Sequence, residues 1–196
     1  MGSMQQSNLR TFIVVFLVVA VCIAVPFVMP LVSNAFLYPV SHTAEIEASA
    51  ERHGVDPYMV CAIIRCESGW DENAVSDAGA QGLMQIMPET AQTMVNFGRV
   101  DPERFPVDDL MTPATNIEYG CAYLSYLAEE FATPEEIAAA YNAGVMPVRI
   151  WVANAENSGA DFVDEIEYQE TRAYVARVMV SHTGYQASYP NLLPAE

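Results

Sequence analysis

From residue 40 onward, apolar residues recur with the period of an α-helix rather than that of a strand. Within residues 112–131, for example, Ile117, Cys121, Leu124 and Leu127 are three or four positions apart and share one helix face. Further helices are predicted over residues 40–52, 57–68, 88–97, 133–143, 147–152 and 170–183. There is no alternating strand pattern of useful length and no internal repeat. The pattern predicts an all-α, or nearly all-α, single domain.

Residues that favour helix ends support these boundaries. Asp56 is a good N-cap and is followed by proline at the first helical position. Thr133 and Glu136 have the spacing of a capping box, and Gly69 is well placed to end the helix over 57–68. That helix is apolar on nearly every side, which predicts that it is buried.

The apolar run Thr11–Val32 contains no charged residue and is long enough to cross a hydrocarbon core of about 30 Å. Arg10 precedes it, and no basic residue follows until Arg52, so the positive-inside rule places the N-terminus in the cytoplasm. A cleaved signal peptide is the alternative, because Ser33-Asn34-Ala35 fits the small-x-small cleavage pattern. The run is longer than an ordinary signal core, and this favours an uncleaved anchor.

These features predict a single-pass protein of the cell membrane with an extracytoplasmic helical domain, or a secreted domain if the chain is cleaved at Ala35. Met1-Gly2-Ser3 resembles a cloning remnant. The expected divisions are a cytoplasmic tail over 1–10, the anchor over 11–32, a linker over 33–39, the domain over 40–187 and a C-terminal tail over 188–196.

Charge narrows the range of partners. The chain has 25 acidic residues, all after residue 40, against eight basic ones, and its formal net charge is -17. All the basic residues are arginine. Such a surface argues against a nucleic-acid partner, because phosphate binding needs a basic face.

Cysteine and histidine give little sign of a metal site. No CxxC or HxxxH spacing occurs, and the three histidines are scattered along the chain. We therefore expect neither metal nor cofactor. Cys61, Cys66 and Cys121 are either buried free thiols or include one bridge from Cys121 to one of the other two.

Glu67 is the first candidate for chemistry. It lies at the last turn of the predicted buried helix, where burial and the negative end of the helix dipole both disfavour its charged form. A general acid that works near neutral pH needs such a raised pKa. The alternative is a glutamate that simply reaches solvent at the helix end, and spacing alone does not separate the two.

Two later segments, and Tyr174 on the last predicted helix, could complete a site. In the glycine-rich stretch over residues 79–85, backbone can approach a ligand closely, or the stretch is a tight turn that feeds Leu83, Met84 and Ile86 into the core. Tyr141 and Asn142 end one predicted helix, and the side chains of both suit sugar hydroxyls and amides. Tyrosine rings also pack in cores, which is their commoner role.

Taken together and in order, ESGW, Ser76, GAQGLMQIMPETA, NIEYGCAYL, AAYNAG and ETRAYV resemble the lytic transglycosylases of the soluble Slt type. The resemblance covers residues 39–185. It implies a lysozyme-like, mostly helical catalytic domain that cleaves bacterial murein. Cysteine before Glu67, and a long acidic stretch over 145–169, depart from the family's usual pattern.

The resemblance also implies roles for single residues. Glu67 matches the catalytic acid/base, and Tyr174 matches a tyrosine close to it. Substrate-binding positions of the family are matched by Ser76 and Gln85 around the cleavage point, by Met84 and Met87 in an apolar wall, and by Tyr141 and Asn142 in the groove. Glu170 is expected to be mainly structural.

The implied reaction cleaves the β-1,4 bond between N-acetylmuramic acid and N-acetylglucosamine and closes a 1,6-anhydro ring, with Glu67 as the single acid/base. A lysozyme-type hydrolase on the same fold is the nearest alternative, with a second carboxylate from Asp71, Glu72 or Asp77. A non-catalytic peptidoglycan-binding scaffold is another, as is a domain that serves a larger cell-envelope machine. The expected partners are peptidoglycan glycan strands and the membrane.

Overall fold

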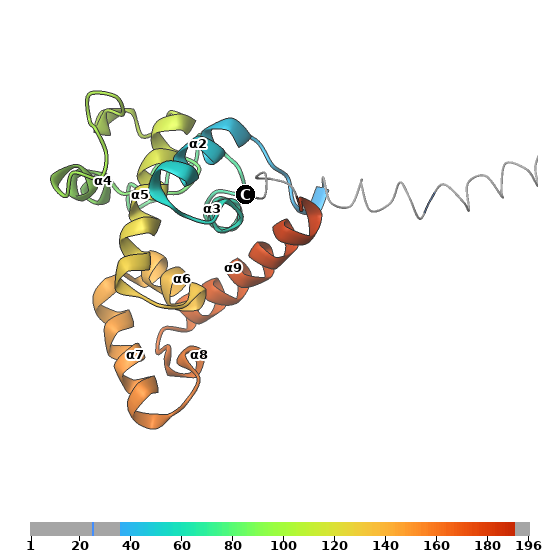
Figure 1. Cartoon of the computed structure of the whole chain (residues 1–196), viewed down its shortest axis with the longest axis vertical. Helices are drawn as coiled ribbons and strands as arrows, with labels where there is room; N and C mark the ends of the chain where they lie inside the picture. The colour runs from blue at the N-terminus through green and yellow to red at the C-terminus, as the bar shows by residue number, and fades with distance from the viewer. Residues whose placement is uncertain (1–24, 26–35, 191–196) are drawn as a thin grey trace, which may run out of the picture. The chain divides into compact units, whose positions relative to one another are not determined.

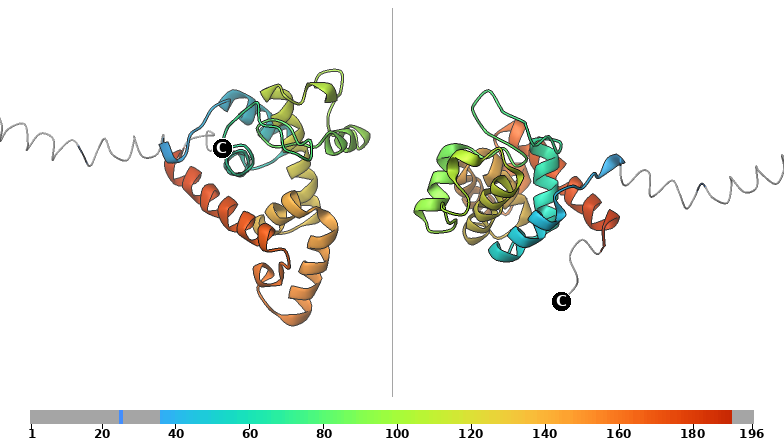
Figure 2. Two further views of the ribbon diagram at one scale, coloured as in Figure 1. Left: turned by 180° about the vertical axis from the view of Figure 1, so that it is seen from behind. Right: turned by 90° about the horizontal axis from the view of Figure 1, so that it is seen from above.

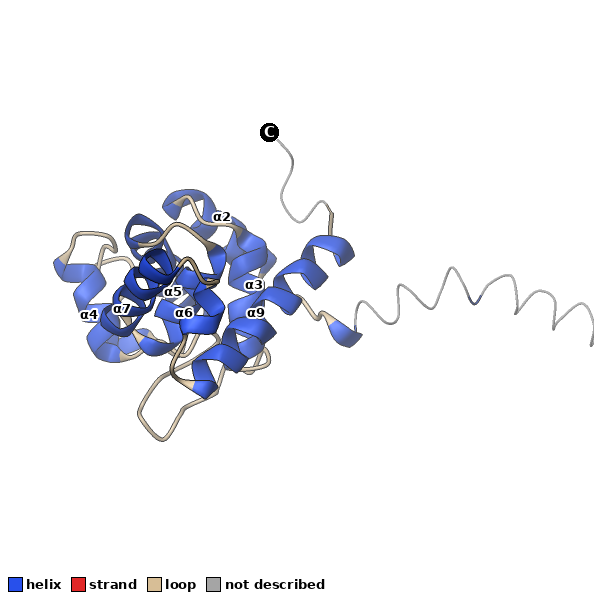
Figure 3. Ribbon diagram, turned by 90° about the horizontal axis from the view of Figure 1, so that it is seen from below, coloured by secondary structure: helices blue, strands red, loops and turns tan. Residues whose placement is uncertain are grey.

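The computed structural model describes Val25 and residues 36–190. The described residues from Val40 on belong to one compact unit, which is built of helices and connecting loops (Figure 3). Apart from Val25, the predicted span Thr11–Val32 lies outside the described residues. Among those that are described, no helix has both the length and the apolar character needed to cross a membrane. The anchor therefore stays a prediction.

The helical unit contains nine elements that the structure describes, and their order is shown in Figure 1. They are α2 (Thr43–His53), α3 (Pro57–Glu67), α4 (Pro88–Asn96), the 3-10 turn η1 (Val107–Asp109), α5 (Pro113–Glu130), α6 (Pro134–Ala143), α7 (Val145–Ser158), α8 (Phe162–Glu165) and α9 (Gln169–Ser188). The predicted helical class is confirmed.

Two capping predictions are confirmed in detail. The Asp56 side chain accepts a hydrogen bond from the Tyr58 backbone N–H at 2.8 Å, and this begins α3. Thr133 and Glu136 form a reciprocal capping box at the start of α6. These caps fix where two helices start, because each satisfies backbone donors that the helix leaves unpaired.

The prediction was too short for α7 and α9, and it missed η1 and α8. The helix predicted over 147–152 runs from Val145 to Ser158, where Gly159 in the left-handed conformation ends it. Only Val148 and Trp151 of this helix are buried. Its second half therefore carries no apolar periodicity that could have signalled a helix.

The core forms around α3, whose residues Val60 to Ile64 are fully buried. This helix packs against α9, which also packs against α6, while α2 lies against α5. Figures 1 and 2 show α7 and α8 at one end of the unit, away from α4. Because α3 ends at Glu67 and lies along α9, that carboxyl group is held against the longest helix that the structure describes.

Of the two alternatives for the cysteines, the free-thiol alternative holds among the described residues. Cys61 and Cys121 are buried, and Cys66 is half-buried. Burial raises the pKa of both Cys61 and Cys121 to about 12. These two thiols therefore stay protonated and behave as small apolar side chains.

Candidate active site

Glu67 is paired with Tyr174. Glu67 is the last residue of α3 and is half-buried, whereas Tyr174 is buried in the first half of α9. The Tyr174 hydroxyl donates a hydrogen bond of 2.6 Å to Oε1 of Glu67. The contact joins residues 107 positions apart in the sequence. It holds the carboxyl group in one orientation.

The surroundings of Glu67 favour its neutral form. Burial raises the pKa of the Glu67 carboxyl, and the Tyr174 hydrogen bond and the Arg177 charge only partly oppose this. Burial also raises the pKa of Tyr174 well above its usual range, and the nearby Glu67 charge adds to the effect. Tyr174 thus stays a hydrogen-bond donor, while the pKa of Glu67 is shifted upward, the direction that a general acid needs.

Tyr141 joins this pair to the glycine-rich loop. Its hydroxyl donates to the backbone carbonyl of Met84 at 2.8 Å. Burial raises the pKa of Tyr141 well above its usual range, and the charge of Glu67 contributes to this rise. The Glu67 charge acts on Tyr141, so the two side chains are near enough to interact electrostatically.

The loop over residues 74–86 is braced from within. Backbone bonds run from Gly82 to Ala74 and in both directions between Gln81 and Ile86, at 2.9–3.1 Å. The Gln85 amide donates to the carbonyls of Ala74 and Gly82 at 3.0 and 2.9 Å. The Ser76 hydroxyl accepts from Ala80 N–H at 3.0 Å. In this structure Ser76 and Gln85 thus shape the loop.

The side chain of Asn116 on α5 also holds this loop in place. Asn116 was not among the site residues predicted from the sequence. Its side chain accepts from Met84 N–H at 2.7 Å and donates to the carbonyls of Gln81 and Leu110 at 2.7 and 2.8 Å. A Cβ on Gly82 would come within 2.5 Å of this side chain. A polar asparagine inside a fully buried stretch of helix is the signal that could have found it.

Met84 does not fit the role of an apolar wall. Its side chain is fully buried and packs on Gly120, where an added Cβ would lie 2.1 Å from its sulfur. Leu83 and Ile86 are buried as well. The core alternative for these three residues is therefore correct, and Met84 faces the site only through its carbonyl. Met87, at the start of α4, is half-buried.

The remaining candidates lie nearer the surface. Asn142 is exposed, and its side-chain oxygen accepts from the Thr171 hydroxyl at 2.7 Å. Asp71, Glu72 and Asp77 are all exposed, as expected for solvated loop charges. No group of three or more metal-ligating side chains is found within the part of the chain that the structure describes.

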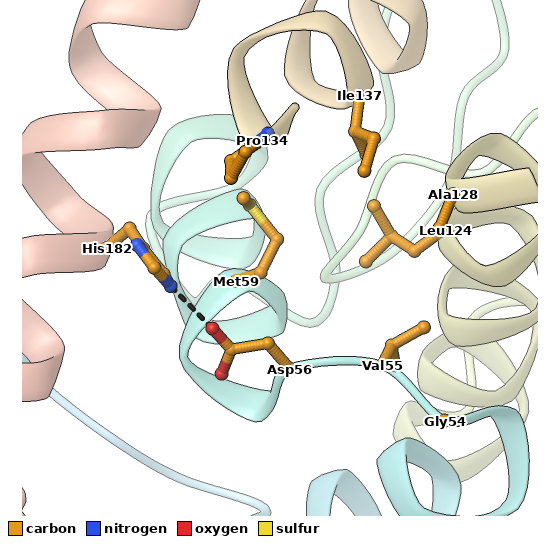
Figure 4. Close-up of a pocket in the computed structure, with 9 residues that line it drawn as sticks. All are labelled: Gly54, Val55, Asp56, Met59, Leu124, Ala128, Pro134, Ile137 and His182. Atoms are coloured by element: carbon orange, nitrogen blue, oxygen red, sulfur yellow. Dashed lines mark hydrogen bonds and ion pairs between the residues drawn. The ribbon is translucent and has the colours of Figure 1, made fainter. Parts of the chain in front are cut away.

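A separate pocket lies around the start of α3, whereas Glu67 ends that helix. It has a volume of about 160 Å³ and is lined mainly by apolar side chains of α3, α5 and α6 (Figure 4). At its edge, His182 of α9 contacts Asp56 at 2.6 Å. None of the predicted site residues lines it.

Residues 45–162 match the family model described as the transglycosylase SLT domain. The chain belongs to this family. A soluble lytic murein transglycosylase of Salmonella typhimurium is 41% identical over 128 residues, which cover 64% of this chain and 20% of that protein. An endo-type membrane-bound lytic murein transglycosylase A of Klebsiella pneumoniae is 33% identical over 152 residues, which cover 72% of each.

Solved structures of this family share the fold. The 70 kDa soluble lytic transglycosylase of Escherichia coli aligns with a TM-score of 0.74 at 32% identity, covering 83% of this chain and 27% of that one. The same kind of enzyme in complex with bulgecin A aligns with a TM-score of 0.72. The lysozyme-like fold predicted for the helical unit is thus confirmed, and the chain spans about a fifth to a quarter of the soluble relatives.

Proposed function

We propose that this protein is a peptidoglycan lytic transglycosylase with Glu67 as its single general acid and base. The observation that carries the proposal is the Glu67–Tyr174 pair, in which a carboxyl group of raised pKa is oriented by a buried hydroxyl. Membership of the transglycosylase SLT family supports the choice of substrate. The bond cleaved is the β-1,4 linkage between N-acetylmuramic acid and N-acetylglucosamine.

The proposed reaction needs one carboxyl group in two protonation states. Neutral Glu67 gives its proton to the bridging oxygen as the glycosidic bond breaks, which releases N-acetylglucosamine as an alcohol. The carboxylate that results then takes the proton from the 6-hydroxyl of the muramic ring. That oxygen bonds to the ring carbon left electron-poor, and a 1,6-anhydro ring closes. Glu67 ends protonated, so no proton is gained or lost overall.

Other residues are proposed to hold the glycan. Ser76 and Gln85 present polar groups from the braced loop, and Met87 offers a half-buried apolar surface beside it. Tyr141 and Asn142 do the same from the end of α6, where the Tyr141 hydroxyl already contacts the loop. Tyr174 acts as a positioning residue for Glu67.

A hydrolase on this fold is the second candidate. It needs a carboxylate that activates water on the face of the sugar opposite Glu67. Asp71, Glu72 and Asp77 are all exposed, and no hydrogen bond or ion pair that the structure describes joins any of them to Glu67. A non-catalytic scaffold is disfavoured because a carboxyl group partly desolvated against tyrosine costs stability that a binder would have no reason to keep.

The finer cellular assignment is also a proposal. The apolar run Thr11–Val32 supports a single-pass anchor that holds the catalytic domain outside the cytoplasm, and a membrane-bound relative covers most of this chain. Service within a cell-envelope machine is compatible with this placement. Fractionation of cells that express the full chain, with protease added to spheroplasts, tests both the anchor and its orientation.

Mass spectrometry of muropeptides tests the reaction. The full chain, in detergent, digests purified murein sacculi beside Glu67→Gln and the matched control Glu51→Gln, an exposed glutamate of α2. We expect anhydro products, lighter by one water than reducing muropeptides, from the wild type and the control only. Reducing products would point to the hydrolase, and Asn or Gln variants of the three loop carboxylates would then be assayed.

A further inference from the structure

Arg177 of α9 lies over the ring of Tyr174, the tyrosine that hydrogen-bonds to Glu67. Its guanidinium carbon is 5.7 Å from the ring centre, which is within the range of a cation–π contact. The two residues are three positions apart on α9, so their side chains are neighbours on the helix surface. Arg177 is exposed, whereas Tyr174 is buried. A surface cation therefore contacts the buried ring that orients the candidate catalytic carboxyl group.

The ring beneath Arg177 differs from the other rings that arginines contact. Arg99, for example, is 5.5 Å from the centre of the Tyr126 ring and forms an ion pair with a glutamate. The hydroxyl of Tyr174 instead donates to Oε1 of Glu67 at 2.6 Å. A guanidinium group, an aromatic ring, a hydroxyl and a carboxyl group thus follow one another in contact. Groups arranged in this way polarise one another, so a charge at the surface influences the carboxyl group at the far end.

The contact strengthens the hydrogen bond that Tyr174 makes. A positive charge over a phenol ring draws electron density from the oxygen, so the O–H group becomes a better donor. A better donor favours the ionised form of the carboxyl group that accepts from it. In agreement with this, burial raises the pKa of Glu67, and the charge of Arg177 opposes the rise. Arg177 thus partly cancels the effect of burial on the carboxyl group.

Neighbouring ionisable groups do not account for this effect. Burial raises the pKa of the Cys66 thiol on α3 and of the Tyr141 hydroxyl on α6, and the charge of Glu67 adds to both rises. Both groups are therefore neutral near pH 7. Other charged side chains on the surrounding helices are exposed or have partners: Glu170 is exposed, His182 contacts Asp56, Arg65 donates to Ser181, and Arg52 and His53 bind Glu118. Arg177 combines contact with Tyr174 and an effect on the charge of Glu67.

We propose that Arg177 is a positioning residue that acts on Glu67 through the ring and hydroxyl of Tyr174. This inference rests on the proposed function, in which Glu67 first gives a proton and then takes one. Burial favours the neutral form that gives a proton, and a cation over the Tyr174 ring favours the ionised form that takes one. Arg177 itself contacts neither the glycan nor the reacting atoms. Its effect is on the balance between the two forms of Glu67.

Titration of Glu67 by NMR tests the proposal without substrate. The full chain is labelled at the glutamate carboxyl carbon and measured in detergent, and the Glu67 signal is identified by its absence in Glu67→Gln. Because Arg177 favours the ionised form, we expect the titration midpoint of Glu67 to move to higher pH in Arg177→Gln. The matched control is Arg149→Gln, which removes an exposed arginine from α7 and should leave the midpoint unchanged.

A double variant tests the route through Tyr174. Arg177→Gln is introduced into Tyr174→Phe, which lacks the hydroxyl, and the shift in midpoint is measured against Tyr174→Phe alone. We expect less than half of the shift that Arg177→Gln causes in the wild type. A shift of half or more would mean that Arg177 acts on Glu67 directly, and it would overturn the proposal. No shift in the wild-type background, or an equal shift in Arg149→Gln, would overturn it as well.

Salt provides a second measurement if Tyr174→Phe does not fold. Charges that interact across solvent are screened by salt, whereas a guanidinium group in contact with a ring is screened much less. The shift caused by Arg177→Gln should therefore keep more than half of its size from low to high salt. A greater loss would assign the effect to long-range charge and contradict the proposed route.

Kinetics connects the contact to the reaction. The alkaline limb of kcat/KM on murein reports an ionisation of the free enzyme, so it should move to higher pH in Arg177→Gln together with the Glu67 midpoint. At the pH where the wild-type value has fallen to half its maximum, the variant should keep more than half of its own maximum. A limb that stays in place while the midpoint moves would overturn the role in catalysis.

The two readouts also separate this inference from the proposed function. If the midpoint moves but the wild type forms no anhydro products, the proposed function fails and the effect of Arg177 on Glu67 stands. If anhydro products form and the midpoint does not move, the inference about Arg177 fails alone.

Discussion

Two glutamates lie inside this helical unit, and their surroundings drive their pKa values in opposite directions. Glu67 meets one tyrosine hydroxyl and a more distant arginine, so burial dominates and the pKa of the Glu67 carboxyl rises. Glu118 of α5 is more deeply buried, yet Arg52 and His53 bind both of its oxygens. Burial raises the pKa of Glu118, but these partners outweigh it and lower the pKa to about 2.

The difference shows what separates the carboxyl proposed to be catalytic from a structural one in the same unit. Burial alone does not decide it, because burial raises the pKa of both carboxyl groups. The number of charged partners does, since each cation or donor that faces a carboxylate favours its ionised form. A carboxyl left with few partners keeps a proton available, and a carboxyl with many partners holds helices together.

The sharpest contrast is in activity. Glu67→Gln is expected to lower kcat/KM on murein about 1,000-fold, because general acid–base catalysis supplies roughly 10²–10⁴ of an enzyme's rate. Its melting temperature at pH 7 should not fall, since the substitution removes a carboxyl that is costly to ionise. Turbidity loss of sacculi and differential scanning fluorimetry measure the two quantities. A fall in both would mean that the residue is structural.

Glu118→Ala should have the opposite effect, with a loss of stability in place of a direct loss of catalysis. Removing one partner of a buried ion pair leaves the other charges unpaired, so the free energy of unfolding should fall by about 3 kcal/mol. Urea denaturation of the full chain at pH 7 measures it. Glu129→Ala is the matched control on the same helix, because Glu129 forms its ion pair with Arg99 at the surface. We expect a much smaller loss there, because an exposed ion pair contributes little to stability, and equal losses would contradict the comparison.

Stability against pH should separate the two glutamates at acid pH. Glu118 has a folded pKa of about 2, below the ordinary value of 4.5, so its contribution is full above pH 4.5. It is lost as the pH falls toward 2. The wild type's advantage in melting temperature over Glu118→Gln should therefore shrink across this window. An advantage that stays constant down to pH 2 would mean that the cluster does not hold Glu118 ionised.

Glu67 should show the opposite sign in the same scan. Its folded pKa lies above the ordinary value of 4.5, so the native state keeps its proton longer than the unfolded chain does. Wild-type stability is therefore expected to decline relative to Glu67→Gln as the pH rises through 4.5 and beyond. Parallel melting curves for the two proteins from pH 3 to 8 would argue that Glu67 is solvated like a surface carboxyl.

The smallest effect concerns Tyr174. Tyr174→Phe removes the hydrogen bond that favours the charged form of Glu67, so the pKa of Glu67 should rise further. The alkaline limb of the kcat/KM profile should move to higher pH, and the maximal rate should fall by roughly tenfold or less, the worth of one orienting hydrogen bond. An unshifted limb would show that Tyr174 does not touch Glu67 in the working enzyme.

Sequence alone placed Glu67 at the end of a buried helix because both the apolar run and Gly69 are local signals. It could not show from the residues themselves that Tyr174 reaches it, since that contact spans 107 positions and depends on how α3 packs against α9. Resemblance to a family supplied that pairing instead. The order of the motifs likewise suggested that Met84 forms part of an apolar wall of the groove. Its side chain instead packs inward against Gly120.

Polar residues inside helices were the other gap. Asn116 and Glu118 fall in a stretch of α5 that is buried on all sides, and both act through partners in distant segments. Apolar periodicity carries no information about such partners. The second half of α7 escaped detection for a complementary reason, because its residues are mostly exposed and carry no apolar periodicity.

The braced loop over residues 74–86 bears on how inhibitors should be made. Its own backbone, the Gln85 amide, Asn116 and Tyr141 already hold it in place without any ligand. Conformational entropy lost on binding is then expected to fall mainly on the sugar and not on the protein. A compound whose ring is locked in the shape of the transition state should gain affinity chiefly through a lower dissociation rate. Adding groups that contact the loop should increase its affinity little.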